Sequence, residues 1–353
     1  MSNSTPWEAV VGLDLGDQYS YFCDVNVDGS LREEGRLPTN RRAFDLRFTI
    51  KPPLRVIIEA GTHSPWVSRQ LSSLGHDVVV ANPQRLRAIA ESIQKTDRVD
   101  ARTLADLGLH FADRLKTVSH RPEELQRDLE VIRGRQVLVL ARTQLVNHVR
   151  GAVKSAGYRL PATDARFFHT KAARSIPPEL LGVCAPLLAA IANLTAQVRE
   201  CDHAIEELIR TKYPAARCLQ QIPGVGPLIS LTFILTIADP NRFSRTRDVG
   251  AYLGLVPRLR QSGARNPHLH ITRAGDSYLR QLLVQGAHYI LGYRGPDCDL
   301  RRWGLTHAAS GGPAAKKRAV IAVARKLAIL LLRLWTTGEV YEPLRLQKEV
   351  VAA

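Results

Sequence analysis

Two short apolar runs, each ending at an acidic residue, constrain the fold of this chain most strongly. Residues 9–15 (AVVGLDL) contain Asp14 next to their end, and the β-branched run 54–58 (LRVII) is followed at once by Glu59. Short apolar runs between turn signals are typical of buried strands. We therefore expect an α/β domain in which buried strands deliver acids at their ends.

The remaining pattern of the first hundred residues predicts an RNase H-like order of elements. Strands are expected at 19–27, 31–37 and 77–81, and helices at 41–48, at 64–74 and from Pro83 onward. Three hairpin-like strands followed by alternating helix and strand is the order of an RNase H-like domain. The sugar-kinase and actin-like fold also begins with a G-x-D-x-G strand, but the second phosphate loop and adenosine motif that it needs are not found in this sequence.

Four carboxylates are predicted to converge in this domain. Besides Asp14 and Glu59, Asp97 and Asp100 lie three residues apart in K-T-D-R-V-D-A, which places both on one face of a helix. Converging acids repel one another unless cations neutralise them, and Mg²⁺ prefers oxygen ligands, so the set predicts one or two Mg²⁺ ions acting on a phosphodiester. Taken singly, each acid is more often a cap, a turn residue or part of a solvated charged face.

Beyond residue 120 the pattern becomes helical. Residues 123–156 and 186–212 are charged, nearly free of glycine and apolar at helical spacing, and the Pro and Gly residues between them (Pro161, Pro177, Pro178, Gly182) fit a connecting loop. The two segments predict an antiparallel or intermolecular coiled coil, and two helices of an ordinary bundle fit the pattern equally well.

A third region begins near Pro214 and opens with L-Q-Q-I-P-G-V-G-P-L-I-S (219–230), which has the form of a helix-hairpin-helix. Gly224 and Gly226 would let the turn expose backbone N–H groups that hold a DNA phosphate without reading sequence. The charge distribution agrees, because residues 1–110 contain 13 Lys and Arg against 14 Asp and Glu, whereas residues 111–353 contain 36 against 19. Such a positive excess is expected of a surface that neutralises phosphates, and a generally basic protein is the alternative.

Several features favour a bacterial cytoplasmic, nucleoid-associated protein without a membrane span. The five cysteines are dispersed and form no C-x-x-C pair, the pattern of reduced thiols. The first seven residues lack the basic and apolar regions of a signal peptide. The most apolar late stretch, 319–335, is interrupted by three cationic residues, so an amphipathic core helix is expected there.

Two further motifs carry a family resemblance. Residues 252–263 read Y-L-G-L-V-P-R-L-R-Q-S-G, and residues 271–280 read I-T-R-A-G-D-S-Y-L-R. With the D…E…D-x-x-D set, the helical middle and the P-G-V-G-P hairpin, the sequence resembles the DEDD-type insertion-sequence transposases of the one-ten family, over almost the whole chain. Arg273 stands where that family commonly has Lys. Asp276 stands where Asn is common and would put an acid near DNA.

The resemblance implies a fold, a mechanism and partners. It implies a RuvC-like DEDD domain over 1–115, a coiled-coil region over 116–213 and a mainly α-helical transposase domain over 214–353. The four acids would bind Mg²⁺, and Ser262 would attack DNA to form a covalent phosphoserine. An element-encoded bridge RNA would pair with donor and target double-stranded DNA, and the enzyme would work as a tetramer.

The residues allow this chemistry without singling it out. Ser262 before Gly263 fits an ordinary turn, and because no histidine adjoins it, activation by the metal site is the consistent hypothesis. Nucleic-acid contacts are expected from basic residues of the third region: Arg258, Arg260, Arg265, Arg273, Arg280, Arg301, Arg302, Lys316, Lys317 and Arg318. His268 and His270 fit a DNA-facing surface better than a metal site, and Ser277 fits a helix.

Two other functions use the same residues differently. A hydrolytic nuclease, such as a junction resolvase, would use the four carboxylates and water with Ser262 as a bystander. A nucleic-acid-binding scaffold would keep the basic surface and lack cleavage. A covalent protein–DNA adduct is expected only for the strand-transfer enzyme.

Overall fold

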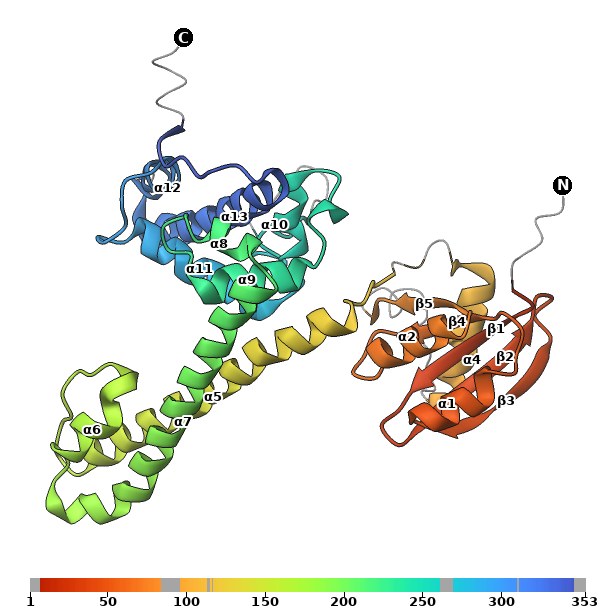
Figure 1. Cartoon of the computed structure of the whole chain (residues 1–353), viewed down its shortest axis with the longest axis horizontal. Helices are drawn as coiled ribbons and strands as arrows, with labels where there is room; N and C mark the ends of the chain where they lie inside the picture. The colour runs from red at the N-terminus through yellow and green to blue at the C-terminus, as the bar shows by residue number, and fades with distance from the viewer. Residues whose placement is uncertain are drawn as a thin grey trace, which may run out of the picture. The chain divides into compact units, whose positions relative to one another are not determined.

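The computed structural model describes residues 7–83, 96–112, 115, 117–260, 269–309 and 311–345. Two compact units are present, an N-terminal unit (Met1–Arg121) and a C-terminal unit (Pro122–Ala353), and Figure 1 shows the elements of each.

The N-terminal unit contains a mixed five-stranded sheet in the order β3-β2-β1-β4-β5. Its strands are β1 (Ala9–Leu15), β2 (Tyr19–Asn26), β3 (Leu31–Pro38), β4 (Arg55–Glu59) and β5 (Asp77–Ala81). The first three strands form an antiparallel meander, whereas β4 runs parallel to β1 and β5 runs parallel to β4. The α/β class and each predicted strand of this region are confirmed.

Helices cover both faces of this sheet, and the alternation of side chains along β1 and β4 explains why. Val11 and Ile58 face a cluster formed with α1 (Arg41–Phe48) and α2 (Ser64–Ser73). Val10 and Ile57 point to the other face and pack under α4 (Asp97–His110). Strands with an apolar core on both faces are expected to be nearly continuous hydrophobic runs, as these are.

The C-terminal unit begins with two long helices, α5 (Glu123–Ser155) and α7 (Pro178–Thr211), which pair within the chain. Their contacts run antiparallel, because Asp128 binds Lys212, Arg135 binds Asp202, and Arg142 approaches Thr195. A short 3-10 turn (Ala165–Phe167) and α6 (Phe168–Ala173) lie between them in sequence.

The second long helix starts eight residues earlier than predicted, so placing Pro178 and Gly182 in a loop was wrong. Pro178 is the first residue of α7, where its missing N–H costs nothing. The helix continues through Pro186, and the residue four positions earlier, whose carbonyl a proline ring crowds, is Gly182. Among the described helices, α7 alone has the length and apolar composition of a membrane span, but core helices also meet this criterion, and α7 buries a stripe against α5.

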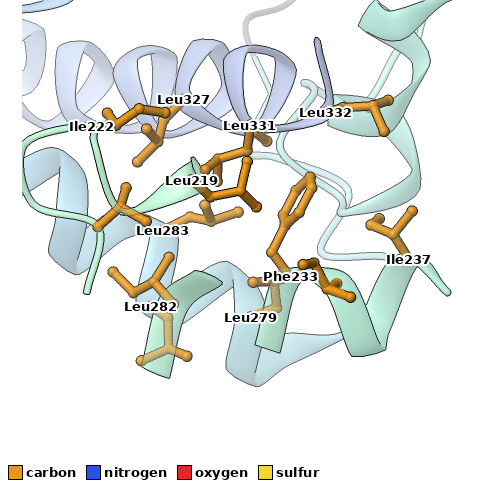
Figure 2. Close-up of a cluster of buried hydrophobic side chains, with 14 of the residues drawn as sticks. Leu219, Ile222, Phe233, Ile237, Leu279, Leu282, Leu283, Leu327, Leu331 and Leu332 are labelled. Atoms are coloured by element: carbon orange, nitrogen blue, oxygen red, sulfur yellow. The ribbon is translucent and has the colours of Figure 1, made fainter. Parts of the chain in front are cut away.

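The remainder of the unit is helical. It consists of α8 (Ala215–Leu219), α9 (Pro227–Ile237), α10 (Val249–Tyr252), α11 (Ser277–Leu291), α12 (Asp299–Ala309) and α13 (Gly312–Thr337), with two 3-10 turns before α10. Figure 2 shows the core, in which Phe233 of α9, Leu279 of α11 and Leu331 of α13 meet. The predicted amphipathic helix over 319–335 is confirmed as part of α13.

Candidate functional site

Asp14 and Glu59 lie side by side at one edge of the sheet. Strands β1 and β4 are parallel with Leu13 opposite Ile58, so the next position along each strand is Asp14 and Glu59. Both side chains are half-buried. Because side chains alternate along a strand, Asp14 shares the face of Gly12 and Glu59 shares the face of Ile57, which is the face covered by α4.

Helix α4 approaches this face so closely that a glycine is required beneath it. A Cβ atom at Gly12 would lie 2.0 Å from the Ala101 carbonyl oxygen and 2.3 Å from the Ala105 backbone nitrogen. Further along the helix, a Cβ at Gly108 would lie 2.2 Å from Cγ1 of Ile57. The same added Cβ at Gly108 would lie 2.9 Å from Cγ1 of Val10, two residues before Gly12 on β1, so α4 runs antiparallel to β1.

The first turn of α4 therefore lies beyond Gly12, at the edge that holds Asp14. This turn carries Asp97, which is exposed, and Asp100, which is half-buried. The Thr96 side chain accepts a hydrogen bond from the Val99 amide and caps the helix, and acids in a first turn are stabilised by the helix dipole. Thus a strand register and a close helix contact bring four predicted site residues to one edge.

The four acids share this edge without closing into a ligand shell. Within the described part of the chain, no three His, Cys, Asp or Glu side chains lie close enough to hold one metal ion. Arg98, which could have neutralised Asp97 and Asp100 from its place in sequence, pairs instead with Glu34 of β3. The metal-ligand atoms that the four acids provide are all carboxylate oxygens, which Mg²⁺ prefers as ligands.

The loop after Glu59 is held by hydrogen bonds that sequence reasoning missed. The Gly61 amide donates to Ser64 Oγ, and Ser64 Oγ lies 2.9 Å from His120 Nε2. Burial and the nearby arginines Arg69 and Arg121 lower the pKa of His120. The Trp66 indole donates to Nδ1 of His63. The available signal was G-T-H-S-P-W directly after the strand, a turn followed by a helix start.

In the C-terminal unit, the P-G-V-G-P segment forms the turn between α8 and α9. Gly224 has a φ of +80°, and its missing side chain admits Gly286 and Tyr289 of α11, so this position requires glycine. Gly226 is the N-cap of α9, and a Cβ there would meet nothing within 4 Å. The turn therefore depends on Gly224 far more than on Gly226.

The segments on either side of the predicted nucleophile pair with each other. The Arg258 amide donates to the His270 carbonyl and the Thr272 amide donates to the Val256 carbonyl. Arg258 and Arg260 are exposed. Ser262, Arg265 and His268 lie outside the described residues.

The second of these segments ends in structural contacts. Arg273 is exposed with a φ of +57°. The Arg280 guanidinium donates to the backbone carbonyls of Leu253 and Ala274, and burial lowers the pKa of Arg280. Arg280 thus ties the two motifs of this region together.

Asp276, the acid that the sequence is expected to place near DNA, makes structural contacts within the C-terminal unit. Its side chain is 8% exposed and pairs with Arg133 of α5. The same carboxylate accepts a hydrogen bond from the Leu279 amide and caps α11, whose first residue is Ser277, as predicted. Helix capping is a role that Asn would also fill.

The other predicted basic contacts divide into two groups. Lys316, Lys317 and Arg318 are exposed in the first turns of α13. Arg301 donates to the carbonyls of Ile290 and Gly292, and Arg302 pairs with Asp297. The first group is available to a ligand, whereas Arg301 serves the fold.

Transposase family models match both the N-terminal and the C-terminal part of this chain. A DEDD transposase model of the IS110 type matches residues 11–157, and the model of the IS116/IS110/IS902 transposase family matches residues 216–298. The transposase for insertion sequence element IS1111A of Coxiella burnetii is 26% identical over 343 residues, covering 94% of this chain and 91% of the relative. A probable family 20 transposase of Pseudomonas aeruginosa is 27% identical, covering 94% and 98%. The transposase for element IS1328 of Yersinia enterocolitica is 27% identical, covering 80% and 84%.

Proposed function

The chain belongs to the IS110-type DEDD insertion-sequence transposases, enzymes that cleave and rejoin DNA, and we propose that it exchanges strands through a covalent phosphoserine at Ser262. The shared edge of Asp14, Glu59 and the first turn of α4 is the observation that carries the metal-dependent part of this proposal. The role of Ser262 rests on the transposase family match over residues 216–298, which include it. DEDD transposase domains are generally metal-dependent, and the all-oxygen donor set fits Mg²⁺.

The strand order supports assigning the N-terminal part to the RNase H-like, RuvC-like class. An antiparallel meander next to two parallel strands, in the order β3-β2-β1-β4-β5, puts the ends of β1 and β4 together. We assign this RuvC-like domain to residues 1–115, the coiled-coil region to 116–213 and the transposase domain with its helix-hairpin-helix to 214–353.

The acids would hold Mg²⁺ from rigid elements. Asp14 and Glu59 are fixed by strand hydrogen bonding, and Asp97 and Asp100 by the capped first turn of α4. Bound there, the cation would activate a hydroxyl and stabilise the departing oxygen. Convergence of four negative charges opposes closure, so these side chains are expected to tighten only around a cation.

Ser262 would attack a phosphodiester that a cation held by the four acids would polarise. Its Oγ forms a bond to phosphorus while the P–O bond to one deoxyribose breaks, and the departing oxygen takes up a proton. The hydroxyl of the incoming strand then attacks the phosphoserine and releases the serine. The number of phosphodiester bonds is conserved, so no external energy source is needed.

Exposed arginines on either side of residues 261–268 in the sequence would bind the attacked phosphate. Arg258, Arg260 and Arg273 have the exposure for that role, and Arg265 belongs to the same motif. Gly224 and Gly226 of the hairpin and the cluster Lys316, Lys317 and Arg318 would contact backbone phosphates elsewhere. Because its guanidinium already binds two carbonyls, we assign Arg280 to positioning the loop.

The proposed partners follow the family. Donor and target DNA are the substrates, an element-encoded bridge RNA would choose both by base pairing, and a cytoplasmic tetramer would be the working assembly. The antiparallel pair of α5 and α7 offers a long surface for such assembly.

Trapping tests the proposal. The protein is incubated with Mg²⁺, the noncoding RNA of its element and labelled donor and target DNA, and label surviving denaturation is sought on the protein. We expect an adduct that is lost in Ser262→Ala and in Asp14→Ala. Metal-dependent nicking without an adduct, undiminished in Ser262→Ala, would instead identify a hydrolytic nuclease. Binding without any cleavage by the folded protein would identify a scaffold.

A further inference from the structure

Two exposed tyrosines lie at the end of α11 and in the turn that follows it, next to the P-G-V-G-P hairpin. Tyr293 is 86% exposed and Tyr289 is 47% exposed. The guanidinium of Arg294, itself exposed, lies 5.1 Å from the centre of the Tyr293 ring. We call residues 289–294 the tyrosine turn. Tyr293 and Arg294 are both exposed and lie outside the buried core of this unit.

The backbone of this turn is fixed from beneath. Arg301 of α12 donates from one nitrogen to the carbonyls of Ile290 and Gly292, each at 2.5 Å. The Gly295 amide donates to the Gly292 carbonyl, and a Cβ at Gly295 would lie 2.3 Å from the Ile290 carbonyl oxygen. Because the Arg301 side chain binds two carbonyls of the turn, the backbone of the turn is rigid. Tyr293 therefore loses little conformational entropy when it binds a ligand.

The turn is also joined to the hairpin. A Cβ at Gly224 would lie 3.0 Å from Cδ1 of Tyr289, so the Tyr289 ring rests on the hairpin that is proposed to hold a phosphate. A backbone site and an aromatic surface therefore lie side by side. Proteins that bind single strands combine these two elements, because a cationic or N–H-rich surface follows the backbone while aromatic rings stack on bases.

The local charge favours an anionic ligand. Arg294 flanks Tyr293, and the nearest acid in sequence, Asp297, is already neutralised by Arg302. Residues 111–353 carry 36 Lys and Arg against 19 Asp and Glu. An acidic protein surface would contact only Arg294, and an apolar one would contact only the tyrosine rings. An unpaired nucleotide would contact both, through its phosphate and its base.

We propose that the tyrosine turn binds an unpaired nucleotide, with its base stacked on Tyr293 and its phosphate held by Arg294 and the hairpin. A base in a continuous duplex has no free face, so the surface would select single-stranded or looped nucleic acid over a plain duplex. This inference deepens the proposed nucleic-acid role of the C-terminal unit and rests on it.

The test compares single strands with duplexes. Fluorescence anisotropy with the full-length protein measures the affinity for a labelled single-stranded DNA, the same sequence as RNA, and the same DNA as a duplex. Tyr293→Ala should weaken single-strand binding about 5- to 150-fold and leave duplex binding unchanged. Tyr293→Phe keeps the stacking face and should bind like the wild type. Tyr158→Ala, which removes an exposed tyrosine of the α5–α6 connection, is the matched control.

The outcomes separate the inference from the function beneath it. Unchanged single-strand binding in Tyr293→Ala, or an equal loss for the duplex, overturns the inference and leaves the transposase proposal standing. Wild-type protein that binds neither form contradicts the nucleic-acid role itself. A difference between the DNA and RNA single strands identifies which of the two supplies the nucleotide.

Discussion

Replacing Gly12 with alanine should displace the helix that carries two of the four acids. The added Cβ would lie 2.0 Å from the Ala101 carbonyl oxygen, whereas ordinary contact begins at 3.4 Å. The obstructing atoms belong to the backbone of α4, so no side-chain rotation relieves the clash, and the helix must move by about 1.4 Å.

Two consequences follow for Gly12→Ala. Overpacking of this kind costs about 1–3 kcal/mol in the free energy of unfolding. A shift of about 1 Å in a catalytic group lowers rates about 100-fold, so metal-dependent DNA cleavage should fall by at least that factor even in protein that remains folded.

The assay pairs hydrogen exchange with cleavage. Amides of β1 and α4 should exchange faster in Gly12→Ala, whereas those of α9 and α13 should not change. Gly61→Ala, at the same sheet edge with no atom within 4 Å of its added Cβ, is the control and should retain cleavage. Wild-type exchange and cleavage in Gly12→Ala would refute the close packing of α4 on β1.

Three further predictions concern buried polar groups. His76 accepts a hydrogen bond from the Leu54 amide and is buried, which lowers its pKa from the usual 6.5. The stability that neutral His76 contributes is therefore present above pH 6.5 and lost as the pH falls below it. His76→Gln should flatten this pH dependence of the free energy of unfolding, measured in urea, and leave only the part due to His120. Asp128 accepts a hydrogen bond from the Tyr213 hydroxyl at 2.7 Å. Asp128→Ala should therefore lower the free energy of unfolding by about 1–3 kcal/mol, and Asp128→Asn should lower it less. Equal free energies of unfolding in the wild type and Asp128→Ala would contradict this contact. Arg142 is 8% exposed, its Nε has no hydrogen-bond partner, and its contact to Thr195 is 3.5 Å long. Replacing this buried cation in Arg142→Met should therefore stabilise the protein by about 1–4 kcal/mol. A lower melting temperature in Arg142→Met would show that the charge of Arg142 is compensated.

The sequence was sufficient for the elements whose signal is local. The helix predicted at 41–48 coincides with α1, and the strand at 77–81 coincides with β5, because β-branched runs and turn residues mark their bounds. Glu59 was placed at a strand end for the same reason. The prediction misplaces the start of α7 because a proline usually marks a helix boundary, whereas Pro186 lies inside the helix.

Contacts between distant segments could not be predicted. Gly12 meets Ala101 across 89 positions, and Asp276 pairs with Arg133 across 143, and neither leaves a periodic pattern in the chain. The hydrogen bonds from Arg280 likewise depend on the carbonyls of Leu253 and Ala274, which come together only when the chain folds. The assignment of Ser262 depends on family motifs, since a serine before glycine is chemically ordinary.

The most direct test of the central claim is to identify the atom that carries the DNA. Trypsin cleaves after Arg260 and Arg265, so denatured, nuclease-treated adduct should yield the peptide 261–265 with the added mass of a nucleotide on Ser262. We predict this modified peptide in reactions that contain Mg²⁺, and its loss in Asp14→Ala. A nucleotide on another residue, or cleaved DNA without any modified peptide, would contradict serine strand transfer by this protein.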